Sequence, residues 1–292
     1  DAGAEAPPVP LPVELLRHLD VHGNLALKRA RFSGLSYTEV RLGIEAAAGR
    51  VRIAPSEAKL YGGRYRGDLS IDATAVPVVT FTEQLTGVDF APLLADLYDT
   101  RRFSGRGNAL LHGTASGMDS AQLLRTLNGT ASFRVDGGAY EGTDLWFEIR
   151  RARALAQGHE LPAAAGTPRT AFTALSGSGR ITNGVLASDD LVAALQYLKV
   201  QGRGTANLDS GALDFHLDAT ALQVPEKDPS AADAAALQGV TVPVTVTGSF
   251  SAPKVRPDLE GYAKARARQE LDKRKDELRQ KLKDKLNQLL GH

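Results

Sequence analysis

The side chains best suited to acid–base or metal chemistry are scattered along this chain. Six histidines occur, and only His18 and His22 stand close together. Their i, i+4 spacing can hold a metal ion on a helix, but a strand-like pattern begins near Leu19, so we expect two surface histidines instead. Asp189 and Asp190 are adjacent. Because adjacent side chains of a strand point to opposite faces, we expect these two carboxylates not to converge.

The sequence also lacks the motifs of nucleophilic and phosphate chemistry. No G-x-S-x-G, H-E-x-x-H or P-loop spacing occurs, and the absence of cysteine excludes disulfides, thiolate metal sites and a cysteine nucleophile. The G-x-G pairs at 177–179 and 202–204 are not followed by a third glycine and a helix, so we interpret them as strand glycines. The sequence therefore predicts a protein that is not an enzyme and that needs no metal or cofactor.

Composition indicates an ordinary folded protein with no bias toward nucleic acid. Hydrophobic residues make up 42% of the 292 residues and charged residues 24%, with a formal net charge of +1. No stretch reaches the ~18 apolar residues of a membrane-spanning helix, and no secretory signal is visible. The chain begins at Asp1 without methionine, so we expect a piece of a longer protein whose signal or anchor would lie upstream.

Alternation of apolar and polar residues is the main structural signal. In residues 213–219 Leu, Phe, Leu and Ala alternate with Asp, His and Asp, and in residues 240–246 four valines alternate with Thr and Pro. Side chains of a strand point to opposite faces in turn, so such runs predict strands with one apolar and one polar face. The strands expected on this criterion are 19–27, 28–33, 37–46, 50–54, 57–61, 64–72, 107–116, 129–136, 171–182, 184–187, 199–208, 212–222 and 239–250.

Three short helices are expected between these strands, at 88–97, 119–127 and 143–156. There the apolar residues recur at helical spacing, and Asp89 and Asp119 are placed to cap the first two helices. Similar apolar–polar–glycine strand starts recur along the chain without a regular period, which favours one long sheet over a solenoid. The fold class is therefore mainly β with a few α-helices.

The two ends differ in composition from the body. We expect a linker at 1–12, a β domain at 13–256 and a basic amphipathic helix at 257–292, since ten Lys/Arg and five Asp/Glu lie between 264 and 285. The leucines of this helix can pack on the edge of the sheet, contact an anionic membrane surface or an acidic partner, or pair in a coiled coil. The side chains expected to make a membrane or partner contact are Lys273, Arg274, Lys275, Arg279, Lys281, Lys283 and Lys285.

Several short motifs, taken in order, carry a family resemblance. They are LYGGRYRG at 60–67, FSGRGN at 103–108, LNGTASF at 127–133, DGGAYEGTDL at 136–145, VPV at 242–244, GSFSAP at 248–253 and RPD at 256–258. Together, over about residues 15–260, the chain resembles the C-terminal region of the AsmA family of Gram-negative envelope proteins.

The resemblance implies a shape, a location and a use. AsmA-like proteins are related to bridge-like lipid transfer proteins, so a long, curled antiparallel sheet forming a groove or half-barrel is implied. An N-terminal helix anchors such proteins in the inner membrane, their bulk lies in the periplasm, and they are implicated in moving phospholipid to the outer membrane and in outer-membrane assembly. The resemblance carries over no catalytic residue. We expect this chain to lack the anchor and to hold at most one end of such a groove.

Two hypotheses follow for the apolar face. In the first, the face shields phospholipid acyl chains, whose exposure to water costs roughly 0.8 kcal/mol per CH₂. In the second, the same residues fill the core of a structural or interaction module that docks envelope partners without lipid. The candidate lining residues are Val51, Ile53, Leu69, Ile71, Leu111, Phe133, Val135, Ile181, Val200, Leu208, Leu213, Phe215, Leu217, Val242, Val244 and Val246.

Overall fold

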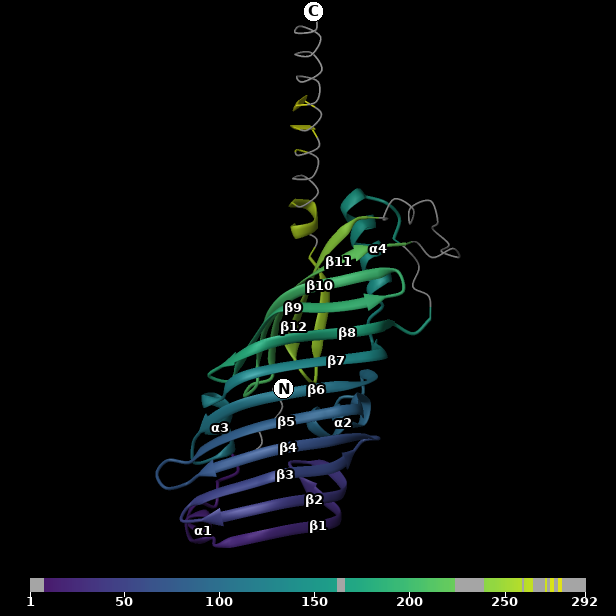
Figure 1. Ribbon diagram of the computed structural model, residues 1–292. Coiled ribbons are helices and arrows are strands. Elements are labelled where there is room, and N and C mark those ends of the chain that lie inside the picture. The colour runs from purple at the N-terminus through teal and green to yellow at the C-terminus, as the bar shows by residue number, and fades with distance from the viewer. Residues whose placement is uncertain are drawn as a thin grey trace, which may run out of the picture.

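One long antiparallel sheet dominates the molecule. The computed structural model describes residues 8–161, 166–223, 239–258 and 260–264, together with residues 271, 274, 275, 278 and 279. Within these residues thirteen strands follow one another in chain order, and each pairs with its sequence neighbours, so β1 and β13 are the two edges of an open sheet. Figure 1 shows the strands rising in order from β1 and the sheet curling toward its C-terminal end.

The elements have the following bounds. The strands are β1 (Val21–Phe32), β2 (Leu35–Ala47), β3 (Arg50–Leu60), β4 (Gly63–Asp72), β5 (Val78–Asp89), β6 (Phe103–Ser116), β7 (Asn128–Glu141), β8 (Arg169–Thr182), β9 (Val185–Leu195), β10 (Leu198–Asn207), β11 (Ala212–Ala221), β12 (Thr241–Ser249) and β13 (Pro253–Pro257). The helices with labels are α1 (Val13–His18), α2 (Phe90–Tyr98), α3 (Ser120–Thr126) and α4 (Leu145–Gln157).

The predicted fold class and its helices are confirmed. The described structure is mainly β, and its antiparallel sheet is not closed into a barrel. The helices α2, α3 and α4 nearly coincide with the three predicted helices. The predicted caps are also present, since the carboxylate of Asp89 accepts a hydrogen bond from the Ala91 N–H and that of Asp119 accepts one from the Gln122 N–H. A change of apolar period and a capping residue were therefore sufficient to locate these helices.

Some predicted strand boundaries are wrong, and irregular pairing explains them. Segment 28–33 belongs to β1, which pairs with β2 without a register shift although Glu39 of β2 has left-handed backbone geometry, with a φ of 53°. Segments 50–54 and 57–61 are both parts of β3, which the register shift between Ile53 and Ser56 divides into two alternating runs. A bulge moves the alternation out of step, so one continuous strand looks like two in the sequence.

Other elements escaped prediction. Residues 78–89 form β5, in which Glu83 takes an apolar-face position and hides the alternation. Strand β9 continues to Leu195 instead of ending at 187, through a bulge at residues 189–190. Helix α1 and strand β13 are too short to give a periodic signal.

Tight turns between neighbouring strands fix the register. The two central residues have positive φ in the turns Ser33-Gly34, Ala48-Gly49, Tyr61-Gly62 and Asn183-Gly184. This left-handed geometry matches the twist of antiparallel strands and suits a two-residue hairpin. Because the register is kept from hairpin to hairpin, apolar side chains line up sideways across many strands, as Ile53, Leu69 and Phe81 do on β3, β4 and β5.

The helices cover parts of one face of the sheet, which we call the inner face. Leu93 of α2 is 4% exposed and packs with Leu60 and Val88. Ile149 of α4 is 1% exposed and packs in a cluster with Val200 and other residues of β10 to β12. The apolar side chains of these helices thus bury separate stretches of the inner face and leave other stretches only partly covered.

The C-terminal end of the sheet curls back over the inner face. The ring of Phe250, in the turn between β12 and β13, lies 5.0 Å from the ring of Tyr98 at the end of α2. Nearby, the hydroxyl of Tyr140 on β7 donates a 3.2 Å hydrogen bond to the carbonyl of Pro253. We call these two contacts the clasp. In Figure 1, β12 accordingly runs behind the middle strands, whereas β1 to β5 form an open part of the sheet.

Candidate functional site

The predicted lining residues share the inner face. Register pairs Val51 with Ile71, Val135 with Leu175, and Leu217 with Val244, and the same alternation continues through the neighbouring strands. No predicted lining residue points to the polar face, which instead carries cross-strand ion pairs such as Arg52–Asp68 at 3.0 Å. Alternation alone was enough to assign these side chains to a face.

Burial divides these residues into two groups. Six of them are less than 9% exposed, namely Val51, Val135, Ile181, Val200, Val242 and Val244. The others are half-buried, namely Ile53, Leu69, Ile71, Leu111, Phe133, Leu208, Leu213, Phe215, Leu217 and Val246. The inner face is therefore neither a completely filled core nor a bare surface, but a curled apolar face that is only partly covered along its length, which we call the groove.

The groove is most open at its β1 end. Val21, Leu25 and Leu27 of β1 are 40%, 41% and 37% exposed, and Phe32 at the end of that strand is 73% exposed. These residues were not among the predicted lining residues, although β1 shows the same alternation. The apolar face is therefore least covered at β1.

A single carboxylate interrupts the apolar face. Among the inner-face positions of β3 to β8, only Glu83 carries a charge, and its register neighbours are Gly67 on β4 and Leu111 on β6. Its Oε2 atom and the hydroxyl of Tyr65 lie together over Gly67, where the missing side chain leaves room for them. The Tyr65 ring meets that of Tyr37 edge-on, with 5.6 Å between the ring centroids.

Burial governs the electrostatics of this polar cluster, formed by Glu83, Tyr65 and Tyr37. Loss of water raises the pKa of Glu83, and the Tyr65 hydroxyl beside the carboxylate opposes that rise. Burial raises the pKa of Tyr37 and of Tyr65, and the neighbouring Glu83 carboxylate raises both further, so both phenols stay neutral. Within the described residues, Glu83 Oε2 is buried and meets no hydrogen-bond donor in good geometry. A charged residue at an apolar position of β5 was the sequence signal for this site, and sequence reasoning missed it.

Comparison with known proteins now adds to this geometry. A family model described as AsmA family matches residues 3–191. This chain belongs to the AsmA family. The match spans β1 to β8 and ends inside β9, so the predicted resemblance is confirmed over that part and the predicted extension to about residue 260 lies beyond it. No curated protein and no solved structure matches the chain.

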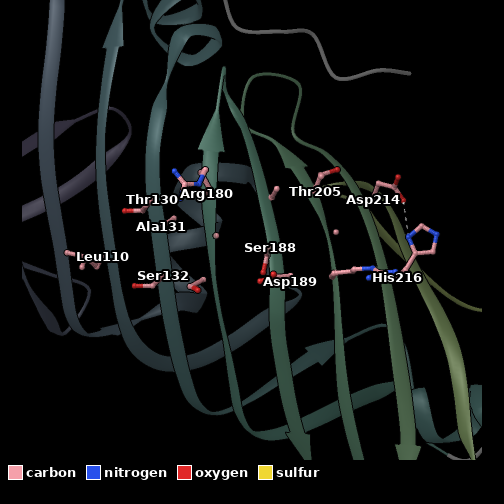
Figure 2. Close-up of a pocket in the computed structure, with 15 residues that line it drawn as sticks. Leu110, Thr130, Ala131, Ser132, Arg180, Ser188, Asp189, Thr205, Asp214 and His216 are labelled. Carbon is pink, nitrogen blue, oxygen red and sulfur yellow. Dashed lines mark ion pairs between the residues drawn. The ribbon is translucent and has the colours of Figure 1, made fainter.

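The polar face of this AsmA-family sheet holds a hollow of about 800 Å³ between β6 and β11. Figure 2 shows Ser132, Arg180, Asp189 and His216 among the side chains that line it. Every charged side chain on its walls is exposed, so the hollow is a shallow trough formed by the twist of the sheet. None of the predicted lining residues contributes to it.

The expected separation of Asp189 and Asp190 is wrong. Pairing shifts so that these two residues of β9 lie opposite the single residue Arg203. Both lie on the polar face, because Asp189 lines its hollow and Asp190 contacts two serines that line the same hollow. A bulge of this kind turns consecutive side chains the same way. The Asp190 carboxylate accepts hydrogen bonds from the hydroxyl and the N–H of Ser178, which lower its pKa. The Asp190 carboxylate therefore links β9 to β8 at the bulge.

His18 and His22 are both exposed, so the prediction of two surface histidines is confirmed. His18 ends α1 and His22 lies on β1, so the two do not share a helix. Among the residues that the structure describes, no group of three or more His, Asp or Glu is placed to hold a metal ion.

The basic C-terminal segment is described only in part. Tyr262 is 4% exposed and packs with the cluster beneath α4, which attaches residues 260–264 to the sheet. Leu271 and Leu278 are 57% and 60% exposed, so of the three alternatives for the leucine stripe, packing on the sheet edge does not hold at these two positions. Of the predicted contact residues, Arg274, Lys275 and Arg279 are helical, while Lys273, Lys281, Lys283 and Lys285 lie outside the described residues. Of the helices that are described, none is both long and apolar enough to cross a membrane.

Proposed function

We propose that this chain is a non-enzymatic periplasmic module that shields or conducts phospholipid acyl chains between the inner and outer membranes. In the full protein it would be tethered to the inner membrane and support outer-membrane assembly and lipid homeostasis. Membership of the AsmA family supports an envelope-associated, lipid-transport-like role. The observation that carries the proposal is the partly open apolar groove, whose half-buried side chains run from β3 to β12.

The physical argument concerns what an acyl chain needs. Each CH₂ group removed from water contributes roughly 0.8 kcal/mol, whatever the detailed shape of its neighbours. Half-buried aliphatic side chains such as Leu69, Leu111 and Leu217 still have surface to offer a ligand. Aromatic residues make up 6% of the chain, so the lining is mostly aliphatic and offers little that would fix one lipid in place.

The alternative is an interaction module whose inner face is filled by its own helices. The cluster beneath α4 favours that reading locally, because Val200, Val242 and Val244 are almost completely buried there. It does not account for the half-buried residues between the helix-covered stretches. The two functions therefore differ in one measurable property, which is whether the folded chain holds lipid.

Native mass spectrometry of the purified chain tests the proposal. We expect phospholipid to co-purify with the wild type and to be lost in Phe215→Asp, which places a charge in the groove. His216→Asp is the matched control, since it changes the next residue of β11 on the polar face. Circular dichroism establishes that both variants fold. A wild type without lipid, or a Phe215→Asp variant that keeps its lipid, would contradict the proposal.

The basic helix supplies a second part of the proposed function, contact with an anionic membrane surface. Exposed Leu271 and Leu278, together with the excess of Lys/Arg over Asp/Glu between 264 and 285, support this contact. Removing residues 265–292 keeps the buried Tyr262 and should abolish sedimentation with anionic liposomes. Equal sedimentation with neutral and anionic liposomes, or sedimentation unchanged by the truncation, would exclude an electrostatic membrane contact.

A further inference from the structure

The polar cluster of Glu83, Tyr65 and Tyr37 is out of place in a groove that otherwise offers only apolar contact. A carboxylate on such a face is costly because it loses water, and it is normally paired with a cation or neutralised. No Lys or Arg occupies an inner-face position from β3 to β8, so no cation of these strands faces Glu83. These strands therefore surround the Glu83 carboxylate with phenol and apolar side chains and supply no cation to pair with it.

The neighbours of Glu83 define what could complete the site. The Oε2 atom has no hydrogen-bond donor in good geometry, although the Tyr65 hydroxyl lies beside it over Gly67. The Tyr37 and Tyr65 rings meet edge-on, and an aromatic face attracts a cation. The Glu83 side chain as a whole is half-buried, so part of it still faces the groove. A carboxylate beside two phenol rings is complementary to an ammonium group.

We propose that Glu83, Tyr65 and Tyr37 form a binding site for the ammonium group of an amine-bearing lipid whose acyl chains lie in the groove. This inference rests on the proposed function, because the lipid is assigned from the apolar face that surrounds the cluster. Leu69 and Phe81 flank the cluster on one side and Leu85 on the other, so a bound head group has apolar surface on both sides. An ammonium both donates hydrogen bonds and neutralises Glu83, whereas a hydroxyl head group does only the first.

A lipid competition measures this preference. The full chain is loaded from vesicles that hold equal amounts of phosphatidylethanolamine, phosphatidylglycerol and diacylglycerol with the same acyl chains, and bound lipid is identified by mass spectrometry. We expect the amine lipid to exceed each of the others by about tenfold. In Glu83→Gln the ratios should fall to about one while total bound lipid stays the same. Glu45→Gln, which removes an exposed carboxylate from the polar face of β2, should keep the wild-type ratios.

The outcomes separate this inference from the function on which it rests. A wild type that binds none of the three lipids overturns the proposed function. A wild type that binds them without preference, or a Glu83→Gln variant that keeps the preference, overturns the ammonium site alone. Equal binding of diacylglycerol and phosphatidylethanolamine would mean that Glu83 only repels anionic head groups, which also overturns it. Free ethanolamine should bind at least a hundredfold more weakly than the lipid, and comparable binding would contradict the assignment to a lipid.

Discussion

Glu83 makes the stability of the lipid-free sheet depend on pH. Burial raises its pKa in the folded state above that in the unfolded chain, so the folded state holds this proton more tightly. The titratable groups that face it are Tyr65 from β4 and Tyr37 from β2, both neutral over this range. Stability is therefore highest while Glu83 is protonated and falls as pH rises through its folded pKa.

Replacing Glu83 by Gln should remove that penalty. At pH 7 we expect the variant to unfold with a free energy about 1 kcal/mol greater than that of the wild type, since the buried charge is gone. At a pH below the ordinary pKa of a glutamate the two proteins should have equal stability. Urea titrations at the two pH values measure the difference. A variant less stable than the wild type at pH 7 would show that the charged carboxylate is well solvated or paired.

A second prediction for a single residue concerns Val135, which lies in the filled part of the inner face. Its side chain is 1% exposed between β6 and β8, so Val135→Ala should lower the free energy of unfolding by about 2 kcal/mol. Val246→Ala, at a half-buried position, should cost clearly less. If chemical denaturation shows that both variants lose the same free energy of unfolding, the two side chains are buried to the same extent.

Residue types predict which face of the sheet a regularly alternating side chain takes, but they do not predict where that alternation is broken. Val135 and Leu217 follow plain alternation, which fixes their face without knowledge of the fold. Glu83 could not be placed, because a charge at an apolar position argues against a strand until neighbouring strands supply the register. Asp190 was misplaced for a similar reason, since a bulge is a property of two paired strands and not of one sequence.

The clasp is the element that decides how the groove is closed. Through Phe250 it joins the turn between β12 and β13 to the end of α2, and through Pro253 it joins the start of β13 to β7. The chain has no cysteine, so Tyr98→Cys with Phe250→Cys introduces the only thiols. A short bis-maleimide should link them within one molecule, as a shift in electrophoretic mobility would show, and neither single variant should show that shift.

Locking the clasp should leave lipid uptake from vesicles unchanged. The least covered part of the apolar face lies on β1, at the far end of the sheet from β12 and β13. If the cross-linked protein no longer takes up lipid while the unlinked double variant does, the entrance lies at the clasp instead.

Short elements and long-range contacts were the least predictable parts of the molecule. A local cap and apolar spacing indicate the helices α2 and α3 in the sequence, whereas β13 has only five residues, of which the first and the last are prolines. The clasp joins residues that lie far apart in the sequence, and nothing local in either segment indicates the other. Such contacts depend on the curl of the whole sheet, which accumulates over many strand pairs.

At the scale of the whole molecule, stability should decrease from the C-terminal end of the sheet toward β1. The cluster beneath α4 buries side chains from β10, β11 and β12, while β1 is an edge strand with mostly exposed side chains. Hydrogen exchange should therefore be fastest for amides of β1 and slowest for those of β10 and β11. Uniform protection along the sheet would show that it unfolds as a single unit.

The pairing of every strand with its sequence neighbours has a consequence for how such a protein can change in length. Inserting or deleting one hairpin adds or removes two adjacent strands and leaves the remaining pairs as they were. With about 4.8 Å between neighbouring strands, each hairpin alters the path across the sheet by about 10 Å. The number of hairpins therefore sets the length of the sheet, and a change in that number leaves the architecture of the remaining strands unchanged.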